Sequence, residues 1–260
     1  MIVYKYIDSA SLDHFFKDGY ISLKFTPHGE FNDPFESYGY SLDDESIESL
    51  TMRHVINCNI ACLCLSKNPL NVLMWSHYSD KHQGFAVAID TEKAGFDDES
   101  KCLITAPQGD IEYLTERRKS KLKVSQDNVY DTDIISKLLL TKSIHWRYEE
   151  EIRIIKKTEF LERQGAVLID KVVNLDAVTE IYIGINNKNF DNIVRNNKEL
   201  ESLILNKTIK LYQCDFKKST WDLDKEDYHY STHPHVMERM EVFDSAEKIL
   251  RAMERNHIND

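Results

Sequence analysis

Apolar and polar residues alternate in several short segments of the chain, and this period of two is typical of β-strands. Alternating segments predict six strands, at Ile2–Ile7, Tyr20–Thr26, Glu151–Lys156, Val167–Val173, Glu180–Ile185 and Thr208–Cys214. Two further segments, Asn59–Ser66 and Phe85–Asp90, are mostly apolar, as strands buried on both faces are. The pattern therefore predicts a sheet of many short strands, with weaker strand character in 102–106 and 110–114.

Apolar residues at helical spacing predict helices between these strands. The predicted helices are a short one carrying Leu12, Phe15 and Phe16, and others at Ile47–Arg53, Val72–Tyr78, Tyr130–Trp146, Phe190–Leu205 and Met237–Arg255. Together the elements predict an α+β fold in which a mixed, mostly antiparallel sheet is flanked by helices. A C-terminal amphipathic helix follows the sheet.

The chain has 260 residues, enough for one large domain or two small ones. It contains only eight glycines and five prolines, and no Gly/Ser-rich stretch marks a hinge. We therefore expect one catalytic-type domain over residues 1–230. Residues 231–260 are expected to form a helical extension that packs on it.

The formal net charge is −11, which argues against strong general affinity for nucleic acid, because that affinity comes from clustered Lys and Arg. The one dense basic run, 116–123, is expected to be a solvated loop or the start of a helix. No run of eighteen apolar residues and no secretory signal are present, so no membrane association and a cytoplasmic location are expected.

Five cysteines in such a chain predict reduced thiols. Cys58, Cys62 and Cys64 are clustered but lack the second ligand pair that zinc sites have. On a strand they would share one face with Ile60. We therefore interpret them as core residues and predict no metal.

The strongest candidate for chemistry is the segment His145–Arg153, which is rich in aromatic and charged residues. Strand alternation would place Glu149, Glu151 and Arg153 on one face. A carboxylate there could act as a base or bind a ligand hydroxyl, with Arg153 fixing it or binding an anion. The alternative is a salt-bridged strand edge without catalytic function.

A second candidate is Phe31-Asn32-Asp33-Pro34-Phe35-Glu36. Asn-Asp-Pro favours a turn, and burial of the two phenylalanines would draw the polar side chains inward. We expect this segment to lie near the late strand. An ordinary structural loop is the alternative.

The third candidate is Met74-Trp75-Ser76-His77-Tyr78. Trp75 or Tyr78 could stack on a planar ligand while His77 donates a hydrogen bond. Core packing of the aromatic residues is the alternative. Tyr4-Lys5-Tyr6, on the first strand, is a weaker fourth candidate.

In their order along the chain, these motifs resemble the prokaryotic domain-of-unknown-function family 2971. The resemblance includes Lys142 and Trp146 ahead of the Tyr148–Arg153 segment, and Ile181-Tyr182-Ile183-Gly184 after it. It extends from about Ile2 to Trp221. The family name implies no activity.

The opening segment YKYIDSASLDHFFKDGYISL is also similar, at the level of fold, to the start of NAD-dependent ADP-ribosyltransferases. This resemblance implies that Lys5 or Tyr6 contacts the nicotinamide ribose, that Tyr78 or Trp75 lines the nicotinamide pocket, and that Glu151 or Glu149 is catalytic. The chain departs from that pattern because its first strand has no His or Arg and no Ser-Thr-Ser motif follows.

The leading hypothesis is an NAD-using ADP-ribosyltransferase, as a toxin or antiphage defence effector acting on nucleic acid or protein. NAD is the expected cofactor, bound as a nucleotide-type small molecule, with Glu149, Glu151 and Arg153 as catalytic residues. The expected NAD contacts are Lys5, Tyr6, Asn32, Asp33, Trp75, His77 and Tyr78. The macromolecular acceptor is not identified by the sequence.

Two other classes stay open. One is a metal-dependent phosphodiesterase or nuclease that uses Asp33, Glu36, Glu149 and Glu151 as oxygen ligands. The other is a non-enzymatic sensor or partner-binding module in which the polar motifs only stabilise the fold.

Overall fold

The structure is a computed structural model, and its described residues are 1–36, 40–42, 47–122 and 130–231. The chain divides into two compact units, Met1–Tyr228 and His229–Asp260. All the elements described below belong to the first unit. The predicted extension over 231–260, with its amphipathic helix, lies outside the described residues apart from Ser231.

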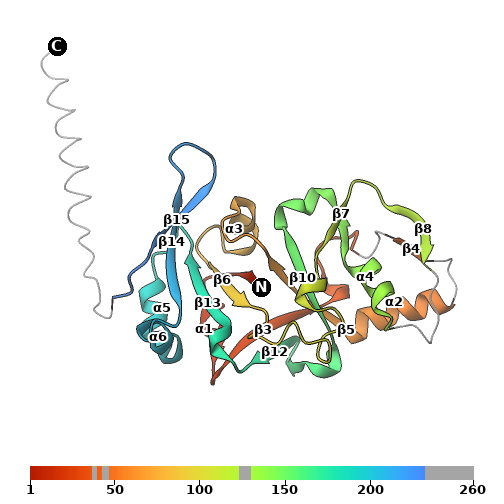
Figure 1. The fold of residues 1–260 in the computed structure, drawn as a ribbon, viewed down its shortest axis with the longest axis horizontal. Helices are drawn as coiled ribbons and strands as arrows, with labels where there is room; N and C mark the ends of the chain where they lie inside the picture. The colour runs from red at the N-terminus through yellow and green to blue at the C-terminus, as the bar shows by residue number, and fades with distance from the viewer. Residues whose placement is uncertain (37–39, 43–46, 123–129, 232–260) are drawn as a thin grey trace, which may run out of the picture. The chain divides into compact units, whose positions relative to one another are not determined.

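A large mixed sheet forms the body of the first unit (Figure 1). Along its main path the strand order is β11-β12-β3-β5-β1-β6-β13-β14-β15, while β10 pairs with β5 and β2 pairs with β3. Its strands are β1 (Ile2–Ile7), β2 (Phe16–Lys17), β3 (Tyr20–Pro27), β5 (Ile60–Ser66), β6 (Phe85–Asp90), β10 (Glu151–Lys157), β11 (Glu162–Gln164), β12 (Val167–Val172), β13 (Val178–Ile183), β14 (Lys210–Phe216) and β15 (Leu223–Asp227).

Within this sheet β13 and β14 pair in parallel, and the other described pairs are antiparallel. The sheet is accompanied by helices, so the predicted α+β class with a mixed, mostly antiparallel sheet is confirmed. Strand β15 has no counterpart in the prediction.

The sheet forks at β5. Strand β10 pairs with β5 over the full length of both strands. The first strand, β1, pairs with β5 only at the Tyr4–Ser66 position, whereas β3 pairs with it at Thr26–Cys62 and Pro27–Ala61. Strands β1 and β3 therefore meet opposite ends of β5 and separate between them.

Two small parallel pairs lie outside the large sheet. Strand β4 (Tyr40–Leu42) pairs with β8 (Arg118–Leu122), and β7 (Glu112–Leu114) pairs with β9 (Thr141–Ser143). The prediction that the basic run forms a loop or helix start is therefore wrong, because 118–122 is a strand. Pairing with a distant segment decided its conformation, and local composition carries no sign of that partner.

Six α-helices and several 3₁₀ turns occur in the described residues. The α-helices are α1 (Leu12–Phe15), α2 (Ile47–Asn59), α3 (Val72–Tyr78), α4 (Thr132–Leu139), α5 (Phe190–Asn196) and α6 (Lys198–Leu205). The 3₁₀ turns are η1 (His28–Glu30), η2 (Ala106–Gln108), η4 (Ile144–Glu149), η5 (Thr158–Phe160) and η6 (Leu175–Ala177). None of the described helices is long and apolar enough to cross a membrane.

Two predicted long helices are shorter in the structure. The helix predicted to continue to Trp146 ends at Leu139 and is followed by β9 and η4. The predicted 190–205 helix is two helices, because Asn197 adopts an extended conformation and its side chain caps α6 by accepting from Leu200 N. A cap of this kind starts a new helix at little cost.

The core near the fork is formed by α2, α4 and the two strands β5 and β10. Its buried side chains include Ile56 of α2, Ile135 of α4, Cys62 of β5 and Ile155 of β10. The prediction that Cys58 shares this core is wrong, because Cys58 lies near the end of α2 and is exposed. Helix α2 runs six residues further than its predicted end at Arg53, and this removes Cys58 from the strand.

Candidate functional site

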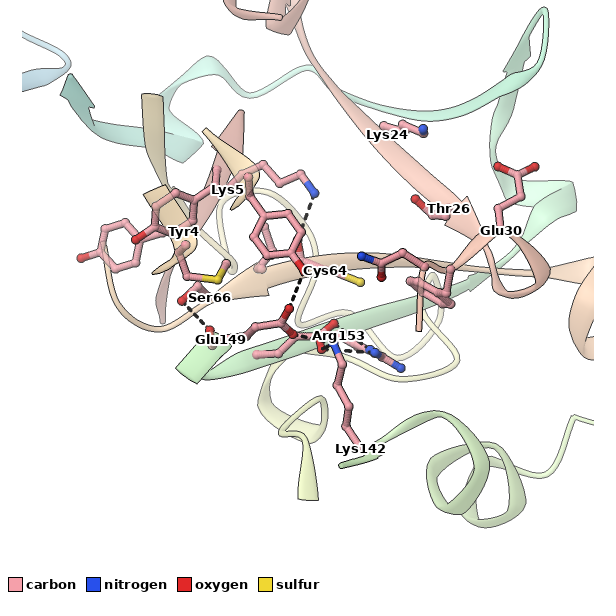
Figure 2. Close-up of a pocket in the computed structure, with 17 residues that line it drawn as sticks. Tyr4, Lys5, Lys24, Thr26, Glu30, Cys64, Ser66, Lys142, Glu149 and Arg153 are labelled. Atoms are coloured by element: carbon pink, nitrogen blue, oxygen red, sulfur yellow. Dashed lines mark hydrogen bonds and ion pairs between the residues drawn. The ribbon is translucent and has the colours of Figure 1, made fainter. Parts of the chain in front are cut away.

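A cavity of about 290 Å³ lies beside β5, where β1 and β3 separate. Figure 2 shows its polar side chains converging from several strands. The lining residues are Tyr4, Lys5, Tyr6, Lys24, Thr26, Glu30, Phe31, Asn32, Cys64, Leu65, Ser66, Met74, Tyr78, Lys142, Glu149, Glu151 and Arg153. The cavity therefore joins the four motifs that the sequence singles out.

Glu149 and Glu151 reach this cavity from different local structures. Glu149 is the last residue of η4, which Ser143 caps by accepting from His145 N. Glu150 then adopts a left-handed conformation, with φ of 45°, and β10 begins at Glu151. The prediction that Glu149 shares a strand face with Glu151 and Arg153 is wrong. The turn at Glu150 nevertheless brings the carboxylates of Glu149 and Glu151 together at the cavity.

Arg153 is fully buried and holds several acceptors at once. Its Nε donates to Glu151 Oε1 over 2.8 Å and its Nη2 to Glu151 Oε2 over 3.2 Å. Its Nη1 bonds the carboxylate of Glu36 and the carbonyl of Leu139. The guanidinium also lies 4.9 Å from the ring centre of Phe31. Arg153 therefore ties the Phe31–Glu36 segment to β10, as the sequence predicted for these two segments.

Lys142 links the two carboxylates of the cavity. Its ammonium lies 2.5 Å from Glu149 Oε2 and 3.0 Å from Glu151 Oε2, and 4.9 Å from the ring centre of Trp146. The side chains of all three charged residues are almost fully buried. Among the described residues, the cluster thus contains three carboxylates, Glu36, Glu149 and Glu151, and only two cations in direct contact with them.

The two cavity carboxylates differ in acidity. Burial alone would raise the pKa of Glu151, but the positive charges of Arg153 and Lys142 outweigh it and lower that pKa to about 2. For Glu149 burial prevails, reinforced by the charge of Glu151, and its pKa is raised despite Lys142. Glu151 is therefore the more acidic of the two carboxyl groups, and Glu149 is the one that keeps its proton to higher pH.

Tyr78 completes the contacts of Glu149. Its hydroxyl donates to Glu149 Oε1 over 2.6 Å. Burial, followed by its hydrogen bond to Glu149, raises the pKa of Tyr78, so the hydroxyl stays protonated. The backbone carbonyl of Glu149 accepts from Ser66 Oγ over 2.7 Å, which anchors the end of η4 to β5.

Lys5 faces the cavity from β1 and forms no ion pair within the described part of the chain. Its ammonium donates to the carbonyl oxygen of Cys64 over 3.1 Å, and Figure 2 shows this bond across the fork. Burial lowers the pKa of Lys5. Burial and the nearby Glu151 raise the pKa of the Cys64 thiol well above its ordinary value, so it is not a thiolate nucleophile.

Seven of the ten predicted site residues line the cavity, and three do not. Trp75 is fully buried, donates from Nε1 to the carbonyl of Pro69 and packs against Tyr6. His77 is exposed on α3. Asp33 is buried in the turn, where it accepts from Phe35 N. None of these three side chains lines the cavity that the other seven share. Phe35 is also exposed, contrary to the burial expected of it.

Several cavity residues are not predicted as site residues by the sequence. Lys142 belongs only to the family pattern, and the pairing of β9 with β7 brings it to the carboxylates. Lys24, Thr26 and Ser66 carry no local sequence signal, and Cys64, predicted to be a core residue, is half-buried and lines the cavity. Alternation along Tyr20–Thr26 could have indicated that Lys24 and Thr26 share the solvent-facing side of β3.

Among residues 1–36, 40–42, 47–122 and 130–231, no group of three or more His, Cys, Asp and Glu side chains is arranged to hold a metal ion. The carboxylates of Glu149 and Glu151 already accept from Lys142, and Glu151 also from Arg153. A divalent cation would have to displace those contacts.

Comparison with known families identifies one match. Residues 74–154 match the model of a family described as a protein of unknown function (DUF2971). The matched segment contains five of the polar residues that line the cavity, namely Tyr78, Lys142, Glu149, Glu151 and Arg153. Comparisons with curated proteins and with solved structures gave no match. The resemblance predicted from the motifs is therefore confirmed over this segment, which is similar to the DUF2971 family.

Proposed function

We propose that this cavity binds NAD and transfers its ribosyl group, as expected of an ADP-ribosyltransferase-like enzyme. The observation that carries the proposal is the pair of buried carboxylates Glu149 and Glu151, which Lys142 bridges beside the cavity. Their pKa values are shifted in opposite directions. Paired carboxyl groups with separated acidities are the usual requirement for acid–base chemistry at a sugar centre. The aromatic residues Tyr4, Tyr6 and Phe31 line the same cavity and would contact a planar ring.

In this proposal the bond between the ribosyl C1 carbon and the nicotinamide nitrogen breaks, and its electron pair leaves with nicotinamide. The ionised Glu151 stabilises the positive charge that develops on the ribosyl group. The acceptor forms the new bond at that carbon through an oxygen or nitrogen, and its proton passes to Glu149. Tyr78 and Lys142 orient the Glu149 carboxylate for this step.

The geometry favours Glu149 over Glu151 for direct contact with the substrate. Glu151 accepts two bonds from Arg153 and one from Lys142, so its oxygens are largely occupied. Each oxygen of Glu149 has one described partner. A carboxylate can accept about four hydrogen bonds, which leaves Glu149 capacity for a ligand hydroxyl.

The non-enzymatic alternative has one observation in its favour. Arg153 joins Glu36 and Glu151 in a buried network, and such networks also occur where they only specify the fold. A protein of this kind would bind a nucleotide-type ligand through Lys5 and the aromatic walls without turning it over. The two candidates differ in one measurable property, the release of nicotinamide.

The cytoplasm is the proposed location, because all five cysteines are free thiols. A role as a toxin or antiphage effector is part of the same proposal. Growth arrest on expression in bacteria that depends on Glu149 would support that role.

The test is nicotinamide release from NAD by the purified full chain, with and without candidate protein or nucleic-acid acceptors. We expect Glu149→Gln to lower the rate by about 10²–10⁴-fold, the usual contribution of a general base. Glu150→Gln is the matched control, because Glu150 is adjacent and its carboxylate bonds Asn68 outside the cavity.

Calorimetric titration with NAD and, separately, with Mn²⁺ gives the second readout. Binding of NAD without turnover by the wild type would favour the non-enzymatic candidate. Binding of Mn²⁺ that depends on Glu149 and Glu151, with no binding of NAD, would contradict the proposal and favour a phosphodiesterase.

A further inference from the structure

The cavity continues into a second lobe of about 480 Å³. Five residues line both spaces, namely Lys5, Tyr6, Lys24, Thr26 and Tyr78. The two spaces are therefore lobes of one groove that extends from the carboxylates, past residues of β1 and β3, toward the β2–β3 turn. In Figure 2, Lys24 and Thr26 extend from one strand and lie away from the group formed by Glu149, Lys142 and Arg153.

The second lobe is rich in positively charged side chains. Lys5, Lys17 and Lys24 line it together with His14, and none of the three lysines forms an ion pair within the described residues. Asp8 is the one carboxylate among its described lining residues, and it accepts from Ser11 N over 2.8 Å at the start of α1. This local excess of cations stands out in a chain whose formal net charge is −11.

The strand geometry explains why these side chains face the groove. On β3 the residues Tyr20, Ser22, Lys24 and Thr26 alternate with buried apolar residues, so they share one face. Strand β2 is joined to β3 by a two-residue turn with positive φ at Asp18 and Gly19, and Lys17 lies opposite Tyr20. The hairpin thus adds the Lys17 ammonium to the face that already carries Lys24.

The charges of Lys5 and Lys24 also act on each other. Burial is the main cause of the lowered pKa of Lys5, and the positive charge of Lys24 lowers it further. An anion placed between the two ammonium groups would be attracted to both. Near the first lobe, in contrast, the carboxylates of Glu149 and Glu151 would repel a phosphate.

We infer that the second lobe binds the phosphate-bearing end of the ligand whose ring and ribose occupy the first lobe. The inference rests on the proposed function and extends it, because it predicts that the ligand is a dinucleotide or nucleoside diphosphate lying along the groove. Lys17 and Lys24 contact its phosphates, Lys5 lies at the junction of the lobes, and the hydroxyls of Ser11 and Ser22 are additional donors.

The test compares ligands that occupy one lobe or both. Calorimetry is carried out on the full chain with nicotinamide riboside, which has no phosphate, and with ADP-ribose and NAD. The variant is Lys17→Glu, because Lys17 lines only the second lobe and is exposed on a hairpin strand. The matched control is Lys188→Glu, an exposed lysine that lines neither lobe and gives the same change of net charge.

We expect Lys17→Glu to weaken ADP-ribose and NAD binding by about tenfold or more, as loss of a charge-assisted hydrogen bond does. Binding of nicotinamide riboside should not change, and neither should any affinity in Lys188→Glu. Raising the salt concentration should weaken the two phosphate-bearing ligands only.

The outcomes separate this inference from the proposed function. ADP-ribose binding that depends on Lys17, without nicotinamide release from NAD, supports the inference and contradicts the proposed catalysis. NAD turnover with an affinity unaffected by Lys17→Glu overturns the inference and leaves the proposed function in place. Binding of none of the three ligands overturns both. Lys17-dependent binding of a single-stranded oligonucleotide, without binding of ADP-ribose, also overturns the inference.

Discussion

Strand β10 carries a buried ionic group on each of its faces, and the two groups differ in what surrounds them. On one face Glu151 and Arg153 join Glu36, Lys142 and Glu149 beside the cavity. On the other face Lys156 pairs with Asp170 of β12. The Lys156 ammonium lies 5.6 Å and 5.3 Å from the ring centres of Phe25 and Phe96.

The Lys156 pair is balanced, with one cation, one carboxylate and aromatic rings around them. The cavity cluster is unequal, with more carboxylates than contacting cations among the described residues, and it lines a space that a ligand can enter. Burial of charge alone therefore does not identify a functional site. The proposed site rests instead on unequal charge beside a cavity, where the remaining capacity for hydrogen bonds is available to a ligand.

The largest expected effect comes from removing Arg153. Arg153→Met keeps much of the side-chain volume but leaves Glu36 and Glu151 buried without their main partner. We expect the free energy of unfolding to fall by about 3–5 kcal/mol, as it does when one member of a buried ion pair is lost. Urea denaturation followed by circular dichroism measures it. A loss below about 1 kcal/mol, typical of exposed pairs, would show that the cluster is hydrated.

Glu151→Gln tests the more acidic of the two carboxyl groups in the same cluster. The pKa of Glu151 is about 2 in the folded protein and 4.5 ordinarily, so its ionisation stabilises the fold above pH 4.5, and that stabilisation is lost as the pH falls toward 2. At pH 7 we expect a loss of about 3 kcal/mol in the variant. The difference from wild type should shrink below pH 4.5. A pH-independent difference would contradict the assigned cause.

Breaking the Lys156–Asp170 pair should lower the free energy of unfolding by less and leave ligand binding unchanged. Lys156→Met leaves Asp170 without its partner, but the Asp170 side chain is 18% exposed and can be partly hydrated. We expect a loss of about 1–3 kcal/mol in unfolding free energy. The double variant Lys156→Met/Asp170→Leu should recover most of it. Ligand affinity should be unchanged in both, and a change would remove the distinction between the two faces of β10.

Glu149→Gln should have the smallest effect on stability, with the opposite sign. Because the pKa of Glu149 is raised in the folded protein, its protonated form stabilises the fold below the ordinary pKa. This contribution to the free energy of unfolding is lost as the pH rises through the folded-state pKa. Glutamine has the same shape and no charge, so the variant avoids that loss. It should be slightly more stable than wild type at about pH 7 and equal to it at about pH 4. Denaturation at these two pH values provides the comparison. Destabilisation at neutral pH would mean that the contact with Lys142 outweighs burial.

Much of the sheet could be predicted from periodicity, because alternation reports which face of a strand is buried. Glu151 and Arg153 do share one face of β10, as their spacing predicted. Glu149 reaches the site by another route, since Glu150 adopts a positive φ that non-glycine residues rarely show. No local pattern distinguishes that turn from a continuous strand.

The remaining site residues depend on pairing between distant segments. Lys142 reaches Glu149 because β9 pairs with β7, and Lys24 faces the groove because β1 and β3 meet opposite ends of β5. Trp75 is the opposite case, a predicted site residue that the fold buries away from the cavity. Its aromatic ring suggested a ligand contact, but the carbonyl of Pro69 satisfies its indole N–H and allows complete burial. Sequence patterns reveal neither the pairing of distant segments nor the hydrogen-bond partner of a buried side chain.

The proposed function requires that the cluster beside the cavity holds a ligand, with Glu149 in contact with the ribose of NAD. A crystal structure of the Glu149→Gln variant soaked with NAD tests it most directly, because the variant is expected to bind the substrate and turn it over slowly. We expect the nicotinamide ring beside Tyr4, Tyr6 or Phe31, a ribose hydroxyl near Tyr78 and the substituted side chain, and phosphates near Lys24 and Lys17. NAD bound elsewhere, or no NAD at saturating concentration with Lys142 and Arg153 in place, would contradict it.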